Sequence, residues 1–149
     1  MATSDTVGAS TARTNLVVLV VLRIVGAALL IGMAYIHFHL YQAGYYLTAV
    51  GPAFIANAVL GLLGAIAVLA LPNKMLGIVA ALSSLLELGT LLALLISIYG
   101  SLFGYTETLS APLLKTAFAV ESAGVVVLAV LAVLAVRQFG MWKWLPGRG

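Results

Sequence analysis

Four long apolar stretches dominate the chain, and short polar or turn-forming segments separate them. They cover approximately residues 15–40, 52–71, 75–99 and 113–136. Each stretch is about 20–25 residues long, enough for a helix to cross a hydrocarbon core of about 30 Å. The residues do not alternate as barrel strands do, and the stretches are too long for such strands. The pattern predicts an all-α integral membrane four-helix bundle, antiparallel up-down-up-down.

Prolines and short links set the expected limits of this bundle. Pro52 suits the first turn of the second helix, and Pro72 ends that helix. No link is long enough to hold a soluble domain, so residues 15–137 are predicted to form one domain. The small, polar residues 1–14 predict a disordered cytoplasmic tail. Residues 138–149 predict a cytoplasmic interfacial tail.

The composition changes the picture by excluding whole classes of protein. Hydrophobic residues make up 64% of the chain and charged residues 7%, against about 25% charged in a soluble domain. An ordinary soluble protein and a disordered one are therefore excluded, and the lipid bilayer is the expected partner. The absence of Cys excludes disulfides, thiolate metal sites and a cysteine nucleophile. The net charge of +3 is dispersed beside apolar segments, which indicates no nucleic-acid partner.

The basic residues predict how the bundle is oriented. One side of the expected topology carries Arg13, Lys74, Arg137, Lys143 and Arg148, and the other carries Lys115. Because positively charged loops stay inside, both termini are expected in the cytoplasm. The sequence therefore predicts a multi-pass protein of the cell (plasma) membrane.

Ionisable residues interrupt the apolar stretches at Arg23, His37, Glu87 and Glu121. Such residues are costly in lipid and usually face the bundle interior in pairs. The helix rise places Arg23 and Glu87 about 7.5 Å apart in level, which predicts a contact between the first and third helices. Three interpretations stay open: a structural ion pair, a charged site that binds a head group or relays a proton, and snorkelling of Arg23 to the interface.

A second group of polar residues lies in the outer half of the expected bundle. His37, Asn57 and Glu121 come from three helices and lie within about 9 Å of one another in level. They are predicted to converge above Glu87 as a candidate ligand or proton site. Glu121 is interpreted either as a protonatable site or as a protonated carboxyl that is hydrogen-bonded to Asn57, Tyr35 or a hydroxyl group.

The sequence predicts no metal, no cofactor and no catalytic residue. His37 and His39 point about 200° apart on a regular helix, so they cannot chelate one metal ion. Two-histidine haem ligation across helices would need a histidine on another helix, and both histidines of the chain lie in the first apolar stretch. A phosphate loop, a nucleophile elbow and a zinc-protease motif are all missing from the sequence. An enzyme is therefore not the favoured class.

Two stretches resemble DoxX-like four-helix membrane proteins. They are LRIVGAALLIGMAYIHF, with Arg23 near its start, and LSSLLELGTLLALL, with Glu87 ahead of Gly89. The stretch HFHLYQAGYYLTAVGPAFIANAV is also similar to small uncharacterised four-helix proteins of actinobacteria. The chain departs from DoxX proteins at HFHLY. The resemblance implies the four-helix fold and, for the DoxX type, a quinone-linked redox role.

The sequence leaves three functions open. The first is a non-enzymatic accessory or structural subunit, which works by packing against a membrane protein partner or as a homo-oligomer. The second is a small proton-linked transporter or lipophilic-ligand binder that uses Glu87 and Glu121. The third is a quinone-linked redox subunit. A cavity that touches Glu121 and His37 would favour the second, whereas a filled core would favour the first.

Overall fold

The computed structural model describes residues 3–140, with side chains from Leu16 onward, and it is all-helical. A short 3-10 helix, η1, follows the first of four long helices. The elements are α1 (Thr3–Gln42), η1 (Tyr45–Leu47), α2 (Gly51–Ala70), α3 (Asn73–Tyr99) and α4 (Leu114–Phe139). The four predicted helices are therefore confirmed.

Each of the four helices is long and apolar enough to cross a membrane. In α1 this segment is Leu16–Gln42, and in the others it is the whole helix. Only 22 to 33% of the most apolar window in each helix is buried inside the bundle. Most of the leucine, valine and isoleucine side chains therefore face outward, the reverse of a soluble bundle.

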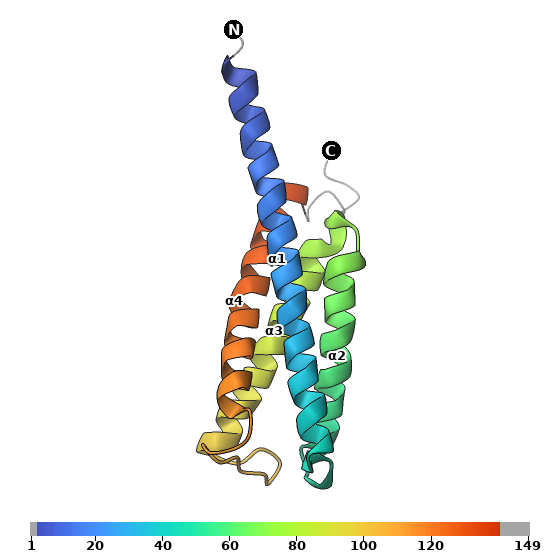
Figure 1. The fold of residues 1–149 in the computed structure, drawn as a ribbon, viewed down its shortest axis with the longest axis vertical. Coiled ribbons are helices and arrows are strands. Elements are labelled where there is room, and N and C mark those ends of the chain that lie inside the picture. The colour runs from blue at the N-terminus through green and yellow to red at the C-terminus, as the bar shows by residue number, and fades with distance from the viewer. Residues whose placement is uncertain (1–2, 141–149) are drawn as a thin grey trace, which may run out of the picture.

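The two longer links, residues 43–50 and 100–113, lie at the same end of the bundle, which we call the loop end (Figure 1). The tight α2–α3 link lies at the opposite end, with the start of α1 and the end of α4. α1 packs mainly on α2 and α4, and α3 packs mainly on α4. Because α1 and α3 hardly touch, they lie diagonally across the bundle.

Small residues let the packed helices approach closely. A Cβ atom at Gly61 of α2 would lie 3.0 Å from the backbone oxygen of Leu30 in α1. A Cβ atom at Gly77 of α3 would lie 2.6 Å from a methyl carbon of Val136 in α4. These two glycines let the backbone of α2 approach α1 and the backbone of α3 approach α4.

Prolines mark the starts of α2 and α3. Pro52 stands in the first turn of α2, where its missing N–H costs no hydrogen bond. Pro72 is the N-cap of α3 and has an extended conformation. Both positions agree with the expected limits of these helices.

α1 differs from expectation at its beginning. The composition of residues 1–14 predicts no ordered structure, but α1 begins at Thr3. Once a helix exists, each added residue gains a hydrogen bond without a new nucleation cost. The apolar part of α1 therefore supplies a nucleus from which the polar segment continues as helix.

Candidate functional site

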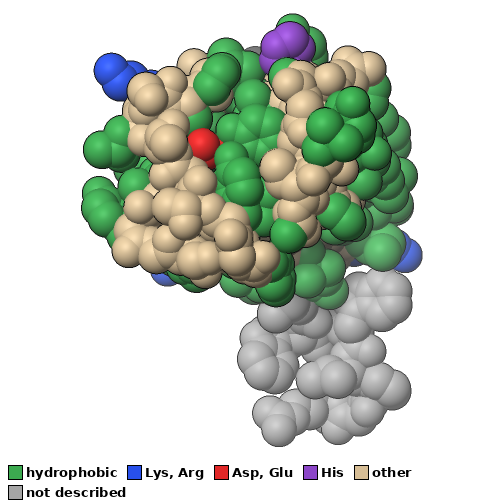
Figure 2. Space-filling model, turned by 90° about the horizontal axis from the view of Figure 1, so that it is seen from below, with side chains coloured by type: hydrophobic (Ala, Val, Ile, Leu, Met, Phe, Trp, Pro, Cys, Tyr) green, Lys and Arg blue, Asp and Glu red, His purple; other side chains and the backbone are tan. Residues whose placement is uncertain are grey.

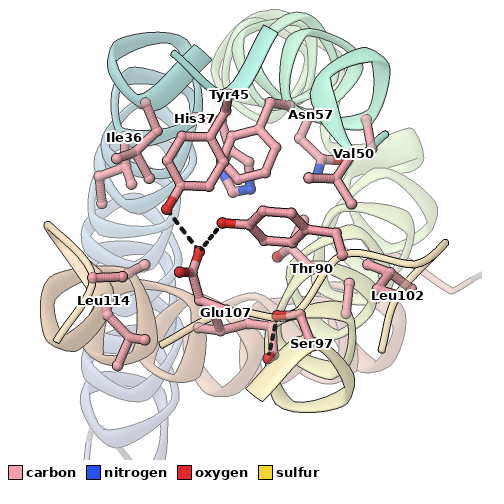
Figure 3. A pocket seen from close by; sticks show the side chains of 18 of the residues that line it. Ile36, His37, Tyr45, Val50, Asn57, Thr90, Ser97, Leu102, Glu107 and Leu114 are labelled. Atoms are coloured by element: carbon pink, nitrogen blue, oxygen red, sulfur yellow. Dashed lines mark hydrogen bonds between the residues drawn. The ribbon is translucent and has the colours of Figure 1, made fainter. Parts of the chain in front are cut away.

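A cavity of about 80 Å³ opens inside the loop-end half of the bundle. Its wall contains residues from all four helices and from both loop-end links (Figure 3). His37 of α1, Asn57 of α2 and Glu121 of α4 all line it, so the three residues converge as their depths predict. The space is large enough for several water molecules or a small polar group. Whether it binds a ligand or a proton stays a prediction.

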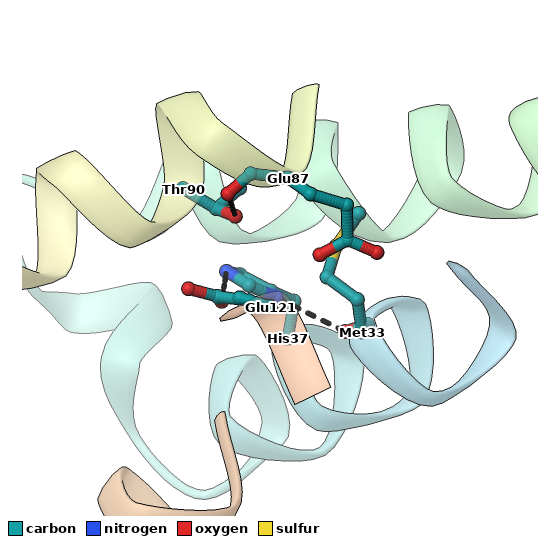
Figure 4. A network of polar contacts seen from close by, with 5 residues as sticks. All are labelled: Met33, His37, Glu87, Thr90 and Glu121. Atoms are coloured by element: carbon teal, nitrogen blue, oxygen red, sulfur yellow. Dashed lines mark hydrogen bonds and ion pairs between the residues drawn. The ribbon is translucent and has the colours of Figure 1, made fainter. Parts of the chain in front are cut away.

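His37 and Glu121 face each other inside this cavity. The His37 Nε2 atom lies 3.9 Å from Glu121 Oε1 (Figure 4). The other ring nitrogen, Nδ1, lies 3.0 Å from the backbone oxygen of Met33. Because a carbonyl oxygen only accepts, Nδ1 carries a hydrogen, and Nε2 of a neutral ring points a lone pair toward Glu121. One proton must therefore lie on this pair, on the ring or on the carboxyl, to avoid two facing acceptors.

Glu121 is buried and incompletely paired. Its side chain is 3% exposed, and its Oε2 atom has no hydrogen-bond partner among the described residues. Tyr35, one of the partners considered from sequence, is 64% exposed and stacks on His39 on the outside of α1. A buried carboxyl oxygen without a donor costs free energy, so Glu121 is the polar group of the cavity that most needs a partner.

Glu87 lies deeper in the bundle and does not line the cavity. The residue is 0% exposed, and in the part of the chain that the structure describes neither carboxyl oxygen has a hydrogen-bond partner. Gly124 of α4 packs directly on it, because a Cβ atom there would lie 2.7 Å from Glu87 Cδ. Glu87 is nevertheless near enough to Glu121 for their charges to interact. The two carboxyl groups therefore differ in access rather than in burial.

The predicted contact between Arg23 and Glu87 is wrong. Arg23 donates hydrogen bonds to the backbone oxygens of Val68, at 2.8 Å, and Leu71. It also donates to Asn73 Oδ1 at 2.8 Å. The small difference in level did not bring the two residues together, because α1 and α3 lie diagonally across the bundle. Arg23 instead satisfies the last carbonyl groups of α2, which have no partner within the helix.

Three residues that the sequence did not single out as site residues close the mouth of the cavity. The Tyr45 hydroxyl donates to Glu107 Oε2 at 2.7 Å, and the Tyr105 hydroxyl donates to the same oxygen at 3.2 Å (Figure 3). Glu107 Oε1 accepts from the backbone N–H of Thr108 at 2.9 Å. We call Tyr45, Tyr105 and Glu107 the clasp. It ties η1 to the 100–113 link across the loop end.

Burial is the largest cause that raises the pKa of both clasp phenols above the ordinary value. For Tyr45, the hydrogen bond to Glu107 and the negative charge of Glu107 raise the pKa further. Both tyrosines therefore stay neutral donors near neutral pH. In a view onto the loop end, an acidic side chain is visible among hydrophobic ones (Figure 2). The sequence offered one signal for the clasp, an acidic residue two positions after a tyrosine in an otherwise uncharged link.

Comparison of the chain with protein-family models, curated proteins and solved structures gives no match. The function is therefore inferred from the site itself. Within residues 3–140, no group of three or more histidine, aspartate or glutamate side chains could hold a metal ion. The facing His37 and Glu121 side chains and the hydroxyl groups of the wall offer proton exchange and hydrogen bonding in a largely apolar cavity.

Proposed function

We propose that this protein is a multi-pass membrane protein that binds a small ligand in the loop-end cavity and exchanges it for a proton held by His37 and Glu121. One observation carries the proposal: the cavity touches both residues. It is supported by the buried Glu121 Oε2 atom, which has no hydrogen-bond partner within the described residues. Ionisable groups inside membrane bundles typically mark substrate paths or proton relays. A purely structural subunit would gain stability by filling this space with apolar side chains.

The proposal includes a topology. The helices form an antiparallel up-down-up-down bundle in the plasma membrane, with both termini in the cytoplasm, because the loop end carries Lys115 whereas the other end carries Lys74 and Arg137. The cavity then opens away from the cytoplasm. A ligand would enter past the clasp, between η1 and the 100–113 link.

Two alternative functions can be tested separately. The first is an accessory subunit, which Arg23 supports because its hydrogen bonds stabilise the α2–α3 turn, a structural role. Such a subunit would be recovered with a partner protein or as a homo-oligomer after native purification. A DoxX-type redox subunit would be recovered with quinone. Mass spectrometry of the purified protein detects a partner protein or a bound quinone, and so distinguishes both alternatives from a ligand-binding protein that works without a partner.

The cavity itself is tested by cysteine accessibility, for which the chain needs no background changes because it has no Cys. Ala93→Cys places a thiol on the cavity wall. Leu92→Cys is the matched control, one residue away on α3, with a side chain that is 49% exposed on the outer surface of the bundle. The proposal predicts that a charged, membrane-impermeant thiol reagent labels the variant at 93 several times faster than the one at 92.

Equal labelling of the two variants would mean that water does not reach the cavity, and the proposal would be wrong. The labelled site must also face the expected side. Reagent added to intact cells should reach position 93 without permeabilisation, since the loop end is proposed to face outward.

A further inference from the structure

The cavity wall holds two carboxyl groups but neither a lysine nor an arginine. Its lining includes the carboxyl groups of Glu107 at the mouth and Glu121 at the floor. None of the lining residues is Lys or Arg, and His37 is the one basic group among them. An anionic ligand would meet two carboxyl groups without a guanidinium or ammonium partner. The charges therefore favour a cation or a hydrogen-bond donor.

The hydroxyl groups of the cavity donate their hydrogens to oxygen atoms of the protein. Thr90 donates to the backbone oxygen of Glu87, and Ser97 donates to that of Leu94, each at 2.8 Å. Tyr45 donates to Glu107 in the clasp. These groups consequently present lone pairs to the interior.

Together with the free Oε2 atom of Glu121, the committed hydroxyl groups make the wall rich in acceptors. Asn57 is a lining residue that offers both donors and acceptors. A ligand that carries several N–H donors complements this wall better than one that carries acceptors.

Aromatic rings form a second part of the wall. The rings of Tyr45 and Phe54 lie 4.7 Å apart between centroids, and those of His37 and Phe54 lie 5.1 Å apart. Tyr105 adds a further ring, 5.8 Å from Tyr45. Faces of Tyr and Phe attract cations, especially where water is excluded. The rest of the wall is aliphatic and suits an apolar body.

From these features we infer that the ligand is a small organic ammonium ion, a primary amine in its protonated form with a short apolar body. This inference rests on the proposed function and names its substrate class. The ammonium group donates to the free oxygen of Glu121 and to nearby hydroxyl oxygens, and the apolar body lies among the aromatic and aliphatic side chains.

The ammonium ion and a proton then compete for the same acceptors. Glu121 is faced by His37 from α1, Thr90 and the deeper Glu87 from α3, and Asn57 from α2. Without ligand, one proton lies on the His37–Glu121 pair. An ammonium donor replaces that proton, which leaves to water, so the net charge of the site is unchanged. Each bound ammonium ion therefore releases one proton.

Three probes of similar size test the inference with the wild-type protein. Benzylammonium, benzyl alcohol and benzoate share one ring and differ in charge, and each is titrated calorimetrically into protein in micelles and into empty micelles. We expect benzylammonium to bind about tenfold more tightly than benzyl alcohol, the size of one charge-assisted hydrogen bond. Benzoate should not bind. A pH indicator should report one proton released per benzylammonium bound.

The affinity for benzylammonium should rise by up to tenfold per pH unit while the pair remains protonated. Equal affinity for benzyl alcohol, tighter binding of benzoate, or binding without proton release would overturn the inference. If none of the probes binds although Ala93→Cys is labelled, the ligand class is wrong and the water-filled cavity stands. If Ala93→Cys is not labelled, the proposed function itself fails.

Two variants test whether the released proton comes from the His37–Glu121 pair. Glu121→Gln keeps the shape of the side chain and should abolish both the proton release and the preference for the cation. Glu107→Gln removes the other carboxyl group of the cavity and leaves the His37–Glu121 pair intact, so binding should weaken while proton release persists. Proton release that is lost in Glu107→Gln and kept in Glu121→Gln would contradict the assignment.

Discussion

At the scale of single residues, the bundle contains two kinds of polar group, distinguished by whether their hydrogen bonds are satisfied. Arg23 is fully engaged, because it donates to two helix-terminal carbonyls and to Asn73. Glu87 and Glu121 keep oxygens without donors in the same bundle. Groups of the first kind stabilise the fold. Groups of the second kind cost stability, and in Glu121 this cost occurs beside a cavity.

Replacing Arg23 should therefore affect the α2–α3 turn and not Glu87. Arg23→Ala should lower the free energy of unfolding by about 1–3 kcal/mol, because buried carbonyl groups lose their donor. In Arg23→Leu combined with Glu87→Leu the two changes in the free energy of unfolding should add within about 0.5 kcal/mol, as expected for separate sites. Denaturation in mixed micelles measures both. A double variant much more stable than the sum would mean that the two side chains interact.

Gly124 and Gly89 offer a matched pair of substitutions on packed helices. Gly124→Ala places a methyl group 2.7 Å from Glu87 Cδ and should cost about 1–3 kcal/mol through overpacking. At Gly89 nothing lies within 4 Å of the added Cβ, so Gly89→Ala should stabilise α3 by about 0.5–1 kcal/mol. Thermal melting in detergent compares them. Equal effects would mean that α4 does not pack on Glu87 at Gly124.

At the scale of elements, the clasp joins η1 to the link between α3 and α4. Glu107→Gln should weaken it, because a neutral amide oxygen accepts less strongly from the Tyr45 and Tyr105 hydroxyl groups. Thiol labelling at position 93 should then become faster than with the clasp intact, when both are measured in the Ala93→Cys background. Unchanged labelling would mean that the clasp does not control access to the cavity.

The clasp also predicts a pH dependence. The pKa of Tyr45 is raised in the folded protein, so the neutral phenol is favoured. Its stabilising effect is complete below the unfolded pKa of about 10 and is lost as pH rises through the folded value. Phenolate absorbance in alkaline titration, taken as the difference between wild type and Tyr45→Phe, should therefore appear above pH 10. It should move to lower pH in Glu107→Gln. A Tyr45 signal that titrates at its ordinary value would contradict the hydrogen bond.

The elements themselves could be predicted from sequence because length, apolarity and prolines act locally. Depth along the helices could also be predicted, and it placed His37, Asn57 and Glu121 together. Depth gives only the position of a residue along the bundle axis, however. Which residues at one level are in contact depends on which helices are neighbours. The Arg23–Glu87 prediction failed for that reason. The clasp was missed because its residues lie in η1 and an irregular link, where no helical period relates Tyr45 to Glu107.

At the scale of the whole molecule, the bundle is apolar outside and partly polar inside, with its cavity at one end. The proposed topology predicts that Ser110→Cys reacts with an impermeant thiol reagent in intact cells. Met75→Cys, near the α2–α3 turn, should react only after the membrane is permeabilised. The reverse pattern would place the cavity on the cytoplasmic side.

The central claim is that Glu121 exchanges a proton with water through the cavity, whereas the equally buried Glu87 is sealed by Gly124. Infrared difference spectroscopy over a pH titration tests it most directly, because a protonated carboxyl group has its own C=O stretching band. We predict that one pH-dependent component of this band is missing in Glu121→Gln and kept in Glu87→Gln and Glu107→Gln. A band that changes with pH in Glu121→Gln as it does in the wild type, or that does not change with pH in the wild type, would contradict the claim.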